Sequence, residues 1–73
     1  MKSYGKVVEY DGYVGNIVDI DGKSYMFVDT DLVDKDINKD DYVSFDAEVY
    51  RDIELTRNMA RFVKKINRDD IKD

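Results

Sequence analysis

Aromatic and basic side chains are the residues in this chain that could do chemistry, since it holds no histidine and no cysteine. The face of an exposed ring can stack on any nucleobase, and a nearby cation can neutralise a phosphate. Two segments, 12–17 and 25–30, carry the central rings and predict neighbouring strands. The candidate contacts for single-stranded RNA or DNA are three rings and three cations: Lys6, Tyr10, Tyr13, Phe27, Arg57 and Arg61.

Ordinary structural roles compete for the same residues. Phe27 suits a hydrophobic core, and a tyrosine can pack its ring while its hydroxyl stays in water. The basic side chains can pair with the acidic segment 29–52, in exposed ion pairs that are individually weak. Both interpretations stay open for the candidate residues.

Catalysis and metal binding find little support in the residue types. Without histidine or cysteine, a nucleophile and its base must come from Ser, Thr, Lys or a carboxylate with a raised pKa, and none lies in a catalytic motif. The acid-rich run from Asp29 has Asp34 and Asp40 where a calcium-binding loop needs glycine and glutamate. The sequence predicts no enzyme, no metal site and no cofactor.

The overall charge works against a polyanionic ligand. The 73 residues carry a net charge of −5, which slows the approach of a nucleic acid. Basic residues gather in 53–68, whereas acidic residues dominate 29–52. The acidic and Tyr side chains could instead dock a basic protein partner, and this alternative stays open. No apolar run is long enough to span a membrane, so we expect a cytoplasmic domain without a membrane partner.

Alternation of apolar and polar residues predicts strands rather than helices. It is clearest over 42–50, where Val43, Phe45, Ala47 and Val49 share one face and Tyr50 falls on the other. Asp-Gly pairs favour tight turns because the turn needs a positive φ. The predicted strands are 4–10, 14–20, 24–28, 42–50 and 59–66, with turns at Asp11-Gly12 and Asp21-Gly22.

Five short strands cover their edges best by curling into a barrel. The predicted fold is all-β, a small five-stranded antiparallel OB-type barrel over 1–66 with a frayed charged tail at 67–73. We expect the fifth strand to pair with the first, which brings Lys6 near Arg61. The segment 51–58 is either loop or helix. A short helical turn is expected near 31–34, with three apolar side chains tucked under the barrel: Leu32, Val33 and Ile37.

With strands in this order, the chain resembles the cold-shock domain family from about residue 5 to residue 66. The similar segments are Gly5-Lys6-Val7, Gly12-Tyr13-Val14-Gly15-Asn16-Ile17, Met26-Phe27-Val28-Asp29-Thr30, Tyr42-Val43-Ser44-Phe45 and Ala60-Arg61-Phe62-Val63. The resemblance implies a barrel that binds single-stranded nucleic acid on its second and third strands. Five aromatic or histidine positions of the family hold other residues here: Glu9, Val14, Asn16, Asp29 and Thr30. Because each stacked base contributes roughly 1–3 kcal/mol, these differences imply weak or specialised binding.

Overall fold

Five strands close into one barrel, which confirms the predicted fold class. A computed structural model describes residues 2–51 and 53–70. The strands lie in the order β1-β2-β3-β5-β4 around the barrel. In chain order the elements are β1 (Lys2–Tyr10), β2 (Val14–Asp19), β3 (Ser24–Val28), the 3-10 helix η1 (Asp29–Asp31), β4 (Tyr42–Arg51), β5 (Thr56–Lys65) and the 3-10 helix η2 (Arg68–Asp70).

One strand contact differs from the fully antiparallel prediction. β3 and β5 run parallel, whereas the other strand pairs are antiparallel. The reason is geometric, because an odd number of strands cannot alternate in direction all the way around a closed ring. The predicted pairing of the fifth strand with the first is also wrong: β1 lies between β2 and β4, and β5 lies between β3 and β4.

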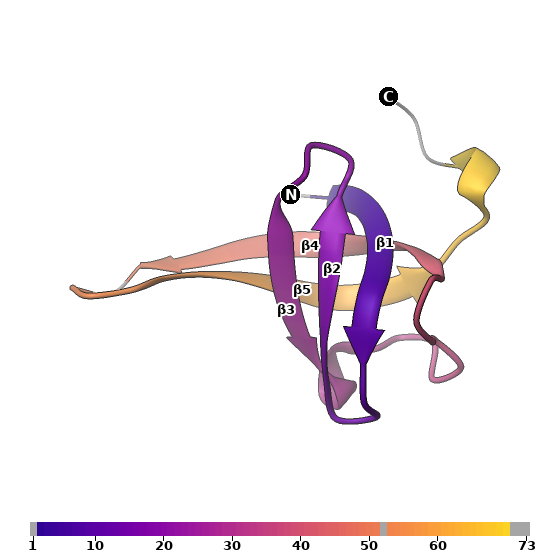
Figure 1. Cartoon of the computed structure of the whole chain (residues 1–73), viewed down its shortest axis with the longest axis horizontal. Coiled ribbons are helices and arrows are strands. Elements are labelled where there is room, and N and C mark those ends of the chain that lie inside the picture. Colours follow the sequence, from indigo (N-terminus) through magenta and orange to yellow (C-terminus); the bar gives the residue numbers. More distant parts are fainter. Residues whose placement is uncertain (1, 52, 71–73) are drawn as a thin grey trace.

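The β4–β5 hairpin extends beyond the body of the barrel as a two-stranded ribbon (Figure 1). Its cross-strand pairs continue to Arg51 opposite Thr56, so the prediction of loop or helix over 51–58 is wrong at residues 51 and 56–58, which belong to β4 and β5. Residues 53–55 are irregular. The turns at Gly12 and Gly22 have φ of 98° and 88°, as the Asp-Gly pairs predicted.

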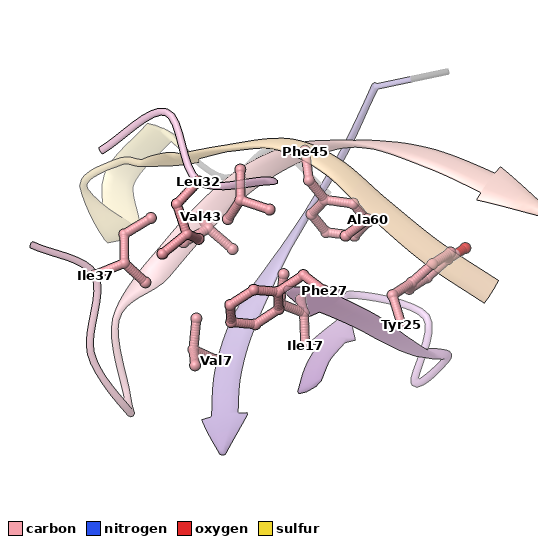
Figure 2. Close-up of a cluster of buried hydrophobic side chains, with 10 residues drawn as sticks. Val7, Ile17, Tyr25, Phe27, Leu32, Ile37, Val43, Phe45 and Ala60 are labelled. Carbon is pink, nitrogen blue, oxygen red and sulfur yellow. The ribbon is translucent and has the colours of Figure 1, made fainter. Parts of the chain in front are cut away.

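The core lies inside the barrel, where the inward side chains of all five strands meet (Figure 2). Each of its large apolar side chains contributes about 1.5–3 kcal/mol through burial. The predicted tuck under the barrel is confirmed for Leu32 and Ile37 and wrong for Val33, which is 53% exposed. The buried apolar residues are Val7, Ile17, Tyr25, Phe27, Leu32, Ile37, Val43, Phe45, Ala60 and Val63.

Short 3-10 helices occupy two of the loop regions. η1 takes the place of the helical turn expected near 31–34 and begins two residues earlier, directly after β3. In the segment predicted as a frayed tail, η2 forms a turn in which the N–H of Asp70 donates to the carbonyl of Asn67 at 2.9 Å. Residues 71–73 of that segment lie outside the described residues.

Candidate functional site

The outer face of β2 and β3 is the surface on which the sequence placed its stacking rings. The strand pleat sends Gly15 and Phe27 inward and leaves Asn16 and Met26 opposite each other on the outside. Val14 and Val28 form the next outer pair. The middle of this face therefore carries apolar and amide side chains and no ring.

Phe27 cannot act as the predicted stacking ring, because its side chain is fully buried. Gly15 lies opposite it and makes room for the ring, since a Cβ there would collide with the Phe27 ring and sit 2.6 Å from the carbonyl oxygen of Glu9. A one-residue change in the phase of a strand moves every side chain to the other face. The sequence interpretation chose the wrong phase for β3, and Met26 takes the outer position instead.

Tyr10 is half-buried rather than open for stacking. Its ring lies 5.2 Å from that of Phe27, at an angle of 39°, and its hydroxyl donates to the carbonyl of Gly12 at 3.1 Å. Burial raises the pKa of the phenol, with smaller contributions from the carboxylates of Asp29 and Asp11. Tyr10 thus supports the core and the adjacent turn.

Tyr13 remains accessible at the β1–β2 turn, where it is 74% exposed. The carboxylate of Asp11 accepts the backbone N–H groups of Tyr13 and Val14, both at 2.9 Å. These two hydrogen bonds lower the pKa of Asp11. They also fix the turn that carries the exposed Tyr13 ring, one residue before β2.

A ring, two cations and a concave surface lie together on the β4–β5 hairpin. A hollow of about 500 Å³ is lined there by Tyr50, Arg51, Leu55, Arg57 and Met59. Within residues 2–51 and 53–70, neither arginine forms an ion pair. An aromatic side chain therefore stands beside two cations that are available to a ligand.

Arg57 and Met59 also connect this hollow to the barrel. They line a second hollow, of about 430 Å³, together with Asn16 and Met26 on the outer face of β2 and β3. Met26 and Met59 are cross-strand partners in the β3–β5 contact. The two hollows form one surface that runs from the β2–β3 face to the hairpin. We call this surface the hairpin face.

Arg61 pairs with the acidic segment 29–52, which is the structural role that the sequence offered as the alternative to phosphate binding. Its Nε lies 2.8 Å from Oδ1 of Asp31, whose carboxylate is buried and whose Oδ2 accepts the N–H of Val28 at 3.0 Å. A terminal nitrogen of the same guanidinium lies 3.5 Å from both Glu48 and the hydroxyl of Tyr50. Two carboxylates already compensate this cation, so a phosphate would have to displace one of them.

Lys6 lies away from the other predicted phosphate contacts. On β1 it stands between Val18 of β2 and Tyr42 of β4, whereas Arg61 lies on β5, opposite Asp46 of β4. The Lys6 ammonium group is 3.7 Å from Asp40. Of the six predicted contacts, only Arg57 lines the hairpin face; Tyr13 is exposed but lines neither of its hollows.

Three residues of the hairpin face were not predicted as contacts from the sequence: Tyr50, Arg51 and Met59. The alternation of 42–50 had already placed Tyr50 on the polar, outer side of its strand. The alternation did not predict that the β4–β5 hairpin extends past residue 50, and this extension brings Tyr50 opposite Arg57.

Neither the acidic loop nor the comparison with known proteins assigns a function to the chain. Among residues 2–51 and 53–70, no group of three or more carboxylates is placed to hold a metal ion. In the same residues no helix has the length and apolar character needed to cross a membrane. No protein-family model matches the chain, and no curated protein matches it either.

Proposed function

We propose that this chain is a cold-shock-like barrel of the cytoplasm that binds a short single-stranded segment of RNA or DNA on its hairpin face. The observation that carries the proposal is the hollow in which the Tyr50 ring stands beside the guanidinium groups of Arg51 and Arg57. A ring next to two cations suits a base and its flanking phosphates. The role is one of binding without catalysis.

The ring count sets the expected strength of binding. Tyr50 and Tyr13 are the two rings that can reach a ligand on or beside the hairpin face, at 49% and 74% exposure. At roughly 1–3 kcal/mol per stacked base, two rings support weak binding. The net charge of −5 also slows the association of the chain with a nucleic acid. We expect a ligand of a few nucleotides and dissociation constants in the micromolar to millimolar range, on the order of 10⁻⁶ to 10⁻³ M.

Nuclear magnetic resonance with the ¹⁵N-labelled chain tests the proposal. We expect hexauridylate or hexathymidylate, added at about 50 mM salt where electrostatic attraction is strong, to shift the amides of 50–59 in a saturable way. The amides of Lys6 and Tyr42 lie on the β1–β4 side and serve as internal controls. The absence of any saturable shift with both oligonucleotides would reject the proposal.

A protein partner is the second candidate, and the composition of the hairpin face favours it. Met59 and Arg57 line both of its hollows, Met26 lines one of them and Tyr50 lines the other. Methionine, tyrosine and arginine are enriched at protein interfaces, and methionine adapts its shape to different ligands. The acidic surface elsewhere suits a basic partner.

The two candidates differ in what the chain retains from a cell extract. A basic protein partner should co-purify with the wild type and be lost from the Asp29→Lys and Tyr13→Ala variants, because both residues are exposed and adjacent where β2 begins and β3 ends. Nuclease treatment should leave that partner in place. If retention is unchanged in both variants, the partner does not use this surface.

A further inference from the structure

Phe62 has an unusual backbone conformation on β5. Its φ is 53°, in the left-handed region that bulky side chains rarely adopt. The pairing with β4 is irregular at the same place, because Lys64 is opposite Ser44 and Arg61 is opposite Asp46. Two residues of β5 therefore oppose one of β4, which is a β-bulge, and bulges redirect side chains.

The bulge turns a large ring into solvent. Val63, the next residue, is fully buried, whereas Phe62 is 64% exposed. A glycine would adopt the left-handed conformation without steric strain, and asparagine would do so more readily than phenylalanine. Neither the backbone nor the core explains a phenylalanine here. An unfavourable conformation that exposes an apolar ring points to a role at the surface.

Phe62 borders a separate hollow of about 270 Å³, which shares no residue with the hairpin face. The side chain of Val33, 53% exposed, forms another part of its lining. Val33 is held beside β5 because its N–H donates to the carbonyl of Val63 at 2.8 Å. The hollow thus has apolar walls from two different parts of the chain.

The charges at this hollow are opposite in sign to the chain as a whole. Lys2 and Lys64 line it together with Asp46, which gives a local excess of positive charge on a protein of net charge −5. Within residues 2–51 and 53–70, neither lysine forms an ion pair. An incoming carboxylate would meet two ammonium groups that no carboxylate of the described residues pairs with, one of which, on Lys2, lies 5.9 Å from the centre of the Tyr4 ring.

We propose that this hollow is a second binding site, for an acidic peptide segment that inserts one large apolar side chain between Phe62 and Val33. A concave apolar pocket is the form that receives an anchoring side chain at a protein interface. Lys2 and Lys64 bind the carboxylates on either side of the anchor. This site is independent of the hairpin face and does not rest on the function proposed for it.

The test is a titration of the ¹⁵N-labelled full chain with the peptide acetyl-Glu-Asp-Leu-Asp-Glu-amide. We expect saturable shifts at the amides of Val33, Phe62 and Lys64, and unchanged amides at Tyr50 and Arg57. Replacing the central leucine of the peptide with alanine should weaken binding about tenfold, because the apolar anchor is lost. Shifts confined to other residues, or no shifts, would overturn the proposal.

The variant Phe62→Gly separates binding from folding. We expect it to fold with a melting temperature equal to or above that of the wild type, because glycine relieves the left-handed strain at φ 53°. It should lose the peptide shifts. Lys64→Gln should weaken peptide binding, whereas Lys39→Gln, an exposed loop lysine outside the hollow, should not. Peptide binding that survives Phe62→Gly, or hexathymidylate shifting Phe62 in place of the peptide, would contradict the assignment.

Discussion

The salt dependence of oligonucleotide binding to an Arg57→Gln variant is the sharpest test of the hairpin face. Arg51 and Arg57 line its hollow of about 500 Å³ and form no ion pair among the described residues, so we count two phosphate contacts. For single strands, the logarithm of the binding constant falls with the logarithm of salt at about −0.7 per contact, which gives a slope of about −1.4. Between about 50 and 200 mM salt, the wild type should lose affinity about sevenfold.

Arg57→Gln should leave one contact. Its slope should be about −0.7, and the same change in salt should cost about threefold in affinity. The assay is a fluorescence titration that follows quenching of the tyrosines by hexathymidylate at four salt concentrations. Arg68→Gln is the matched control, because Arg68 is an exposed arginine on η2 that lines neither hollow of the face. A slope that Arg57→Gln does not change, or that Arg68→Gln reduces equally, would refute the two-contact reasoning.

Three further outcomes test the structural roles assigned to individual residues. Arg61→Gln should lower the free energy of unfolding by about 2 kcal/mol in urea titrations, since it leaves the buried Asp31 carboxylate without its cation. The same variant should leave the salt slope of oligonucleotide binding unchanged. Gly15→Ala should destabilise the barrel by about 1–3 kcal/mol in the same assay, because its Cβ would collide with Phe27; wild-type stability would show that the Phe27 ring is not packed there. Because Asp11 has a lowered pKa in the folded chain, its contribution to stability is present above the unfolded pKa of about 3.9 and is lost as the pH falls through the folded value. The difference in melting temperature between wild type and Asp11→Ala should therefore narrow as the pH is lowered from 7 to 3, and a constant difference would contradict the assigned hydrogen bonds.

The strands and the fold class could be predicted because they depend on local patterns. The alternation over 42–50 marks one buried face, and Asp21-Gly22 supplies the positive φ that its turn requires. Short strands without a covering layer then favour a closed barrel. These signals lie within a few residues of each other and need no knowledge of the rest of the chain.

The candidate site could be predicted only in part, because its positions depend on contacts between distant segments. Tyr25-Met26-Phe27-Val28 is apolar in both phases of a strand, so the sequence did not say which side faces inward. Gly15 on the neighbouring strand decided it by leaving space for the Phe27 ring.

The two arginines also show which properties the sequence determines and which the fold determines. The sequence by itself established that Arg57 and Arg61 belong to the basic segment 53–68, and it placed only Arg61 on a predicted strand. Only the tertiary structure placed the buried carboxylate of Asp31 against Arg61 and left Arg57 without a partner among the described residues. Local pattern determines which residues form strands. The closure of the barrel determines which of their side chains meet, because those neighbours come from parts of the chain that are far apart in sequence.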